Sequence, residues 1–293
     1  MKNILVPTNF STESQYAYAM ALRLARHTNG RVTLLHVLEA PNRRAKPGTD
    51  TADDTNKLSG GENEAPPVID HKLLEAAHHQ LQAFKNEADQ LPSDVPVTDA
   101  VAVGRVGEGI LNAIEHRGID LVIVGAQGHG AVQRFFVGSN TQRLIRLTTC
   151  PVLTVKNAPT GDFGVRTIIF PSDFTEELPI GAGGLRRVQA AFPEAALHLL
   201  HVRKNPKNSA VLQRIRAFAE RVGLLNVHAD VVKANSPAAG IAQYAQQVGA
   251  DLVVIPTHAR SGLSGLLQTS IAETVATHAL PPVLTYHLAR LSQ

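Results

Sequence analysis

The sequence predicts an α/β protein made of two tandem, doubly wound parallel sheets with five strands each. Three observations support this fold class: strand-like and helix-like segments alternate, several strand-like segments are continuously apolar, and one set of motifs occurs twice in the 293 residues. Alternating strands and helices are typical of parallel sheets, and continuously apolar strands fit burial on both faces of the sheet. A chain of this length suggests about two domains.

The repeat consists of four pairs of matching segments: 6–11 with 170–175, 34–37 with 199–202, 118–127 with 249–258, and 150–155 with 281–286. The spacing between partners falls from 165 to 131 residues after the second pair, which predicts an insertion in the first copy. Residues 40–70 are rich in Pro, Gly, Asp, Asn and Thr, so we expect a long loop there, either a solvated connection or a regulatory segment. Pro and Gly interrupt the pattern between the copies, so the predicted domains are residues 1–157 and 164–293.

Local patterns predict each element of the first copy. Short apolar runs predict strands, and apolar residues three and four positions apart predict helices. The predicted strands are 3–6, 31–37, 97–103, 120–124 and 151–155, and the predicted helices lie within 11–30, 72–88, 106–117 and the segment after Gly138. We expect Ser11 or Thr12 to cap the first helix and Gly30 to end it.

Composition and charge narrow the class of protein. The net charge is +3 and Lys and Arg form no dense stripe, which argues against nucleic acid as a partner. No stretch approaches the roughly 18 apolar residues of a membrane span, and the short apolar run at the N-terminus leads directly into a predicted strand rather than resembling a signal peptide. The one cysteine, Cys150, excludes an intramolecular disulfide and is expected to be a buried structural residue. We therefore expect a soluble, cytoplasmic protein.

In the first copy, two loops that directly follow predicted strands contain residues suited to binding a ligand. They are 7–11 (PTNFS) and 125–130 (GAQGHG). Ligands of open α/β sheets bind beyond the carboxyl ends of the strands, where the strand order reverses. If the two strands are neighbours there, both loops face one crevice. The helix after Gly138 would then point its free N–H groups into that crevice, which favours an anion such as phosphate.

Three glycines mark the second of these loops. Gly125, Gly128 and Gly138 are separated by two and nine residues, and Ser139 follows. Glycine lets the backbone turn sharply and approach a ligand closely, but a loop that only packs a helix against the sheet would also explain the spacing. Because the second copy keeps the same frame without these glycines, we expect that the fold as such does not need them, and we interpret them as serving a ligand. Neither GxxxxGK[ST] nor a GxGxxG after the first strand occurs, so a P-loop and a Rossmann dinucleotide site are unsupported.

The segments VPTNFS, LLHV, DLVIVGAQGHG, VGSNTQRLI and CPVLTV together resemble the universal stress protein family. The resemblance covers the first copy apart from the insertion, and all of the second copy, so the chain resembles a tandem universal stress protein. It implies an adenine nucleotide alpha hydrolase-like, Rossmann-like fold. The G-2x-G-9x-G-[ST] pattern is the family's ATP-binding motif, so the resemblance implies ATP in the first copy, with a Mg²⁺ ion held by phosphate oxygens and water.

The resemblance also implies which residues contact the nucleotide. Thr8 and Asn9 would lie near the adenosine, Val37 would offer backbone atoms to the adenine, and the glycine loop would surround ribose and phosphates. The family usually has Asp where this chain has Asn9, so that contact loses its charge. The expected binding residues are Pro7, Thr8, Asn9, Val37, Val124, Gly125, Gly128, His129, Gly138, Ser139, Asn140 and Thr141.

The second copy departs from the motif. Pro256, Ala259 and Thr269 stand at the positions of the three glycines, while Asp173 and Ser270 persist. Proline lacks an N–H donor, and the other two side chains would occupy space near the phosphates. We expect a weak or empty nucleotide site in this copy, or one that takes a different ligand.

The expected function is that of a nucleotide-dependent regulator of the stress response. The second copy would pack against the first through 151–155 and 282–286 as a pseudo-partner, the chain would also form a homodimer, and an unidentified protein partner would sense the nucleotide state. One alternative is a slow ATPase or nucleotidyl-transfer enzyme using the same crevice. Another is a structural stress protein without bound nucleotide.

Catalytic and metal-binding residues are not predicted. No Ser-His-Asp order or pair of carboxylates converges on the loops, although His129 or Arg134 could polarise a phosphate. The thirteen histidines lack the spacing of a zinc site. His36 and His201 occur in both copies of LLHV, which favours a structural role at the strand end.

Overall fold

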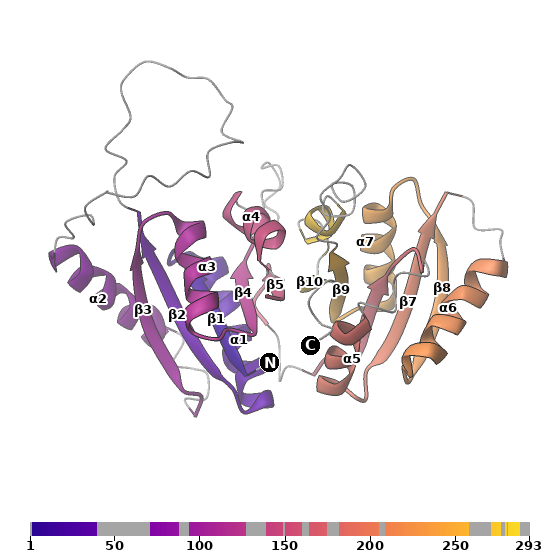
Figure 1. Ribbon diagram of the computed structural model, residues 1–293, viewed down its shortest axis with the longest axis horizontal. Coiled ribbons are helices and arrows are strands. Elements are labelled where there is room, and N and C mark those ends of the chain that lie inside the picture. The colour runs from indigo at the N-terminus through magenta and orange to yellow at the C-terminus, as the bar shows by residue number, and fades with distance from the viewer. Residues whose placement is uncertain are drawn as a thin grey trace, which may run out of the picture.

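The computed structural model describes residues 2–39, 71–87, 94–126, 139–148, 150–159, 164–174, 182–204, 209–257, 271–276, 279 and 281–287. The loop expected at 40–70 lies outside the described residues. Two α/β halves lie side by side, with the helices arranged on both faces of a continuous sheet (Figure 1).

The observed strands coincide with short apolar runs of the sequence. They are β1 (Asn3–Thr8), β2 (Arg31–Leu38), β3 (Val97–Val103), β4 (Leu121–Gly125), β5 (Val152–Val155), β6 (Thr167–Pro171), β7 (Ala196–Arg203), β8 (Val227–Lys233), β9 (Leu252–Thr257) and β10 (Val283–His287). The order across the sheet is β3-β2-β1-β4-β5-β10-β9-β6-β7-β8. The strand order reverses after β1 in the first half (β1–β5) and after β6 in the second half (β6–β10), which creates a switch point in each.

The two predicted five-stranded sheets are joined into one sheet of ten strands. All pairings within each half are parallel, whereas β5 and β10 pair antiparallel, with Leu153 opposite Leu284. The segments expected to join the copies are therefore the ones that meet. Their pairing covers an edge on each half that would otherwise expose unpaired backbone N–H and C=O groups.

The helices divide between the two faces of the sheet. They are α1 (Thr12–Thr28), α2 (His71–Glu87), α3 (Val106–His116), α4 (Ser139–Leu147), α5 (Ala182–Ala191), α6 (Ser209–Val222) and α7 (Pro237–Val248), and residues 271–276 are helical as well. One apolar core lies under α1, α2, α5 and α6, and a second lies under α3, α4, α7 and 271–276. Each core contains residues of both halves. We propose residues 1–157 and 164–293 as the domain boundaries within this shared framework.

The ends of α1 show how local sequence sets an element. Ser11 caps the helix, and its side chain accepts a hydrogen bond from the Ser14 N–H. The C-cap is Asn29, which adopts the left-handed conformation with φ of 50°, so the expectation that Gly30 ends the helix is off by one residue. Gly30 is needed for a different reason, because a Cβ there would lie 2.7 Å from the carbonyl oxygen of Lys2.

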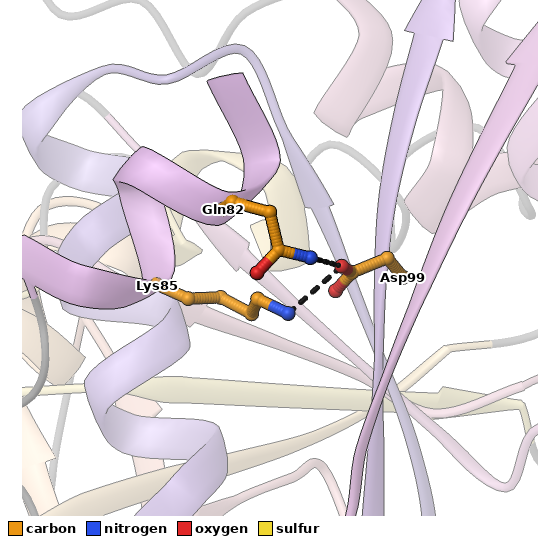
Figure 2. Close-up of polar contacts among 3 residues, drawn as sticks. All are labelled: Gln82, Lys85 and Asp99. Carbon is orange, nitrogen blue, oxygen red and sulfur yellow. Dashed lines mark hydrogen bonds and ion pairs between the residues drawn. The ribbon is translucent and has the colours of Figure 1, made fainter. Parts of the chain in front are cut away.

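Helix α2, the first element after the insertion, is held to the sheet by a polar contact as well as by apolar residues. Figure 2 shows Gln82 and Lys85 of α2 reaching the same carboxylate oxygen of Asp99 on β3, at 2.7 and 2.8 Å. Asp99 and Lys85 are both mostly buried, and the other oxygen of Asp99 is buried without a hydrogen-bond partner. This contact fixes the helix over the outer strand of the first half.

Polar side chains make contacts across the junction of the halves, beside the hydrogen bonds between β5 and β10. His27 on α1 stacks on Phe192 and bonds the Ala191 carbonyl oxygen, and Arg146 on α4 pairs with the buried carboxylate of Glu273 through two bonds. The buried Lys156 donates to the carbonyl oxygen of Ala279. Burial lowers the pKa of Lys156 to about 8. Among the described residues, the junction is therefore a mostly apolar interior with few polar side chains.

None of the helices in the described residues combines the length and apolar character that a bilayer span requires. Cys150 is buried, as expected, and burial raises the pKa of its thiol to about 12. The thiol donates weakly to the carbonyl oxygen of Ile119 at 3.5 Å. A thiol that stays protonated and covered is a structural residue rather than a reactive one.

Candidate functional site

A cavity of about 330 Å³ opens at the carboxyl ends of β1, β2 and β4, where the strand order of the first half reverses. Its lining combines both predicted loops with α1, α3 and α4. The lining residues are Pro7, Thr8, Asn9, Ser11, Glu13, Ser14, Leu35, His36, Val37, Val106, Ile110, Val124, Gly125, Thr141 and Leu144. The volume falls within the range of small-molecule sites. We call it the first cavity.

The loop after β1 is held rigid by its own hydrogen bonds. Thr8 Oγ1 accepts from the Phe10 N–H at 2.9 Å, and Asn9 Oδ1 accepts from the Ser11 N–H at 3.2 Å and from Ser14 Oγ at 2.7 Å. Phe10 adopts a left-handed conformation with φ of 63° and packs its ring on His36. The loop therefore presents a fixed surface to the cavity.

These bonds determine which atom of Asn9 is available to a ligand. A backbone N–H can only donate, so the atom that faces the Ser11 N–H must be the side-chain oxygen. The amide nitrogen is left on the other side, and it can only donate hydrogen bonds. An Asp at this position would offer a second, charged acceptor instead. Compared with an Asp, Asn9 thus removes a negative charge and also presents a hydrogen-bond donor to a ligand where the Asp would present an acceptor.

His36 and His201 have the same structural role in the two halves. His36 Nδ1 donates to the Thr8 carbonyl oxygen at 2.9 Å, and His201 Nδ1 donates to the Ser172 carbonyl oxygen at 2.9 Å. Each bond ties the second strand of a half to the carboxyl end of its first strand, at Thr8 in β1 and at Ser172 directly after β6. The structural role expected for this pair is confirmed by these contacts.

Gly125 corrects one interpretation of the glycine motif. A Cβ at this position would lie 2.3 Å from the backbone carbon and oxygen of Glu13, in the first turn of α1. The expectation that the glycines are not needed for the fold is therefore wrong for Gly125. It permits close packing of α1 on β4 while also lining the cavity. The region of the second half that corresponds to Glu13 lies outside the described residues.

Eight of the other expected residues can be placed fully or in part. Pro7, Thr8, Asn9, Val37, Val124 and Thr141 all line the first cavity with Gly125, and Thr141 is buried. Ser139 and Asn140 form the beginning of α4, and their side chains lie outside the described residues. Gly128, His129 and Gly138 lie outside them as well, as does Arg134. The structure thus brings the loop after β1 to one cavity with Gly125 at the end of β4 and Thr141 of α4.

Helix α3 adds a feature that the glycine pattern does not reveal. Its first residue, Val106, lines the first cavity, and its N-cap, Arg105, makes no side-chain capping bond. Arg143 of α4 lies over this end of α3, because a Cβ on Gly107 would be 3.6 Å from its Cδ and Nε atoms. Uncapped N–H groups beside a guanidinium favour an anion. Comparison of the two copies is the sequence signal for this feature, because Ser236 stands 131 residues after Arg105 and Thr274 stands 131 residues after Arg143.

A second cavity, of about 180 Å³, occupies the corresponding place in the second half. Its lining residues are Pro171, Ser172, Asp173, Leu200, His201, Val202, Pro237, Ile241, Ile255, Pro256 and Ile271. Most of them stand at positions that match the first cavity. The second cavity is smaller and carries a carboxylate at the position of Asn9.

Glu13 is the single carboxylate among the described residues that line the first cavity. No group of three or more His, Cys, Asp or Glu in the described part of the chain could hold a metal ion. One carboxylate fits a Mg²⁺ ion that takes its other ligands from phosphate oxygens and water.

Comparisons with known proteins agree with this architecture. The model of the universal stress protein family matches residues 1–156 and 204–287. The second match omits β6, α5 and β7, so the sequence resemblance in the second half is narrower than expected, although the strand order repeats. A universal stress protein of Methanocaldococcus jannaschii is 27% identical over 155 residues, which are 53% of this chain and 94% of that protein. One of Bacillus subtilis is 26% identical over 154 residues, 52% of this chain and 97% of that protein.

Among solved structures, a universal stress protein from Archaeoglobus fulgidus covers 98% of this chain and 98% of its own, with a TM-score of 0.72 and 16% sequence identity. At that identity the likeness concerns the fold alone, and it extends over both halves. The family model matches well over half of the residues. The chain therefore belongs to the universal stress protein family.

Proposed function

We propose that the first cavity binds ATP and that the protein acts as a nucleotide-dependent regulator of the stress response. The observation that carries the proposal is that anion-favouring groups gather at the first cavity. Val106 at the uncapped end of α3 and Thr141 of α4 line the first cavity, and Arg143 lies beside that end of α3, whereas the second half has Ser236 in place of the cap Arg105, Ala272 in place of Thr141 and Thr274 in place of Arg143.

The two sides of the first cavity suit the two parts of a nucleotide. Val37, Ile110 and Val124 offer an apolar wall for a planar base, and Thr8 and Asn9 offer polar atoms for a ribose. The amino ends of α3 and α4 would take the phosphates, together with the glycine loop between Gly125 and Ser139. When bound, ATP would supply phosphate oxygens as ligands of a Mg²⁺ ion, and Glu13 would be the carboxylate available in the same cavity.

A direct test is to denature the purified protein and identify any adenine nucleotide released. ATP at about one molecule per chain supports the proposal. ADP in its place would support hydrolysis or nucleotidyl transfer in the same cavity. Absence of nucleotide, together with no binding of ATP added at millimolar concentration, would contradict both functions and leave a structural role.

Arg143 provides a sharper test through a matched pair of variants. We expect Arg143→Thr, which introduces the residue of the second half, to weaken ATP binding about tenfold while adenosine binding changes less than twofold, because a charge-assisted bond to phosphate contributes roughly 1.5–3 kcal/mol. Arg117→Thr removes the same charge at the far end of α3 and should leave both affinities unchanged. Calorimetric titration of each variant gives the comparison, and equal losses in the two variants would contradict a specific phosphate contact.

The proposed regulatory role has two further parts. The first is that the chain forms a homodimer, and the second is that an unidentified protein partner binds it in a way that depends on ATP. Molar mass in solution with and without ATP tests the first. Dependence of partner capture on ATP, with Arg143→Thr as the control, tests the second.

A further inference from the structure

A cluster of four ionisable side chains lies on the outer strands of the second half. It consists of His198 on β7, His228 and Asp230 on β8, and Tyr244 on α7. β7 and β8 are the last two strands of the sheet on this side, and α7 packs against both (Figure 1). The described residues that line the two cavities do not include any of the four. The nucleotide site proposed above therefore does not account for this cluster.

His198 is held in one orientation by two polar contacts. Its Nδ1 atom lies 3.2 Å from Asp230 Oδ2 and 2.9 Å from the Tyr244 hydroxyl oxygen. An ionised carboxylate can only accept hydrogen bonds, so Nδ1 carries the proton and Nε2 keeps its lone pair when the ring is neutral. Burial, and then the carboxylate of Asp230, raise the pKa of the Tyr244 hydroxyl, which therefore stays protonated. A carboxylate bonded to the far nitrogen of the ring is also what orients histidines that bind metal ions.

His228 places a second imidazole beside the first. The parallel pairing of β7 with β8 sets His198 directly opposite His228, and the two rings stack with their centroids 4.7 Å apart and 16° between their planes. His228 is exposed, and its ring has no hydrogen bond to the described residues. His198 Nε2 has none to them either and is not one of their buried, unpartnered atoms, so it is open to solvent. Two imidazoles with available nitrogens therefore share one face of the strands.

A metal ion can be held by both rings after a small movement of one of them. Zinc–nitrogen bonds of about 2.0–2.1 Å place the nitrogens of a tetrahedral site roughly 3.3 Å apart. The exposed ring of His228 can tilt toward His198, while Asp230 and Tyr244 keep His198 in place. Water molecules would fill the remaining positions around the ion. Imidazole nitrogens suit Zn²⁺, Cu²⁺ and Ni²⁺, whereas Mg²⁺ prefers oxygen ligands.

In the first half, the corresponding described positions carry other residues. β2 pairs with β3 in the same register, so the same strand pairing forms without any of the four side chains. His198 and His228 are also far apart in the sequence, and only the register of the strands brings them together. The positions that correspond to the cluster are Thr33, Thr98, Ala100 and Ala113.

We infer that His198 and His228 form a binding site for a divalent transition-metal ion of the zinc, copper and nickel class, with Asp230 as the residue that positions His198. The site is separate from the Mg²⁺ ion proposed to accompany ATP. It does not depend on the proposed function, because its residues lie outside both cavities.

Calorimetric titration of the full chain with Zn²⁺ tests the site through a matched pair of variants. His228→Thr introduces the residue of the first half, and we expect it to weaken Zn²⁺ binding at least about tenfold, because one of the two protein ligands is lost. His79→Thr removes an exposed histidine of α2 that lies next to His78 in the sequence, and it should leave the affinity unchanged. Circular dichroism melts establish that both variants are folded.

Two further measurements separate metal binding from folding. Electron paramagnetic resonance of the chain with Cu²⁺ should show coupling to two imidazole nitrogens, and to one in His228→Thr. Asp230→Asn should weaken Zn²⁺ binding by about tenfold while the coupling to two nitrogens is kept. No Zn²⁺ binding at about 1 mM, equal losses in His228→Thr and His79→Thr, or coupling of Cu²⁺ to a single nitrogen in the wild type would each overturn the inference. Zn²⁺ affinity unchanged by Asp230→Asn would overturn the positioning role of Asp230.

Discussion

Gly125 stands where the first turn of α1 meets the end of β4, and it serves packing and cavity lining together. A sequence pattern reports that three glycines are spaced in a certain way, but it does not report which backbone lies against each of them. The contact with Glu13 is set by how α1 crosses the sheet, which depends on the whole half. Arg143 is not predicted from the sequence for a similar reason, because its place beside the start of α3 depends on how α4 packs against α3.

Substitution of Gly125 by Ala should destabilise the protein by about 1–3 kcal/mol or more, since the new methyl group would overlap the Glu13 backbone. Urea unfolding measures the change. Gly107→Ala is the matched control, because a Cβ there has ordinary contacts at 3.6 Å and lies within α3. That control should be neutral or stabilising by up to about 1 kcal/mol, as Ala favours helix over Gly. Equal stability of the two variants would show that α1 shifts freely away from β4.

The elements themselves follow closely from the sequence. Apolar periodicity and continuous apolar runs give the strands and helices of the first half to within a few residues, because each element buries one face or both against its neighbours. Polar residues inside the elements are harder to interpret. Asp99 in the middle of β3 has no counterpart in the second half, where Ala229 stands, and only the position of α2 explains it.

The contact of α2 with β3 leads to a prediction at this scale. Lys85→Met should destabilise the chain by about 1–3 kcal/mol, because it leaves the mostly buried carboxylate of Asp99 without its cation (Figure 2). The double variant Lys85→Met with Asp99→Ala should recover most of that loss, since neither buried charge remains. Chemical unfolding of the single and double variants provides the measurement. A double variant as unstable as Lys85→Met would mean that the ion pair does not matter.

Across the whole molecule, the main difference from expectation is the joining of two sheets into one. The repeat and the apolar segments predict which strands meet, but not that backbone hydrogen bonds make the sheet continuous. The polar residues of the junction are likewise hidden from sequence patterns. Lys156 follows β5 at a position that the sequence suggests is an exposed strand end, but it is buried and donates to Ala279 of the second half.

Lys156 makes the stability of the joined molecule depend on pH. Burial lowers its pKa from the ordinary 10.5 to about 8, so between these values the unfolded chain binds a proton that the folded chain does not. Stability contributed by this residue therefore rises as pH increases from 8 to 10.5, by roughly 3 kcal/mol in total. Comparison of wild type with Lys156→Met removes the effects of Cys150 and the tyrosines. Urea unfolding at pH 7 and pH 10 should show wild type gaining on the variant at the higher pH, and a constant difference would contradict the assignment.

The antiparallel pairing of β5 with β10 has a consequence for how the two halves can diverge. In an assembly of identical subunits, any substitution appears on both sides of the interface and in both cavities at once. Here the partners are connected through residues 156–166, so each molecule contains one half of each kind at any protein concentration. Substitutions in one cavity are then inherited separately from those in the other. Covalent linkage thus allows Asp173 and Pro237 to line one cavity while Asn9 and Val106 line the other.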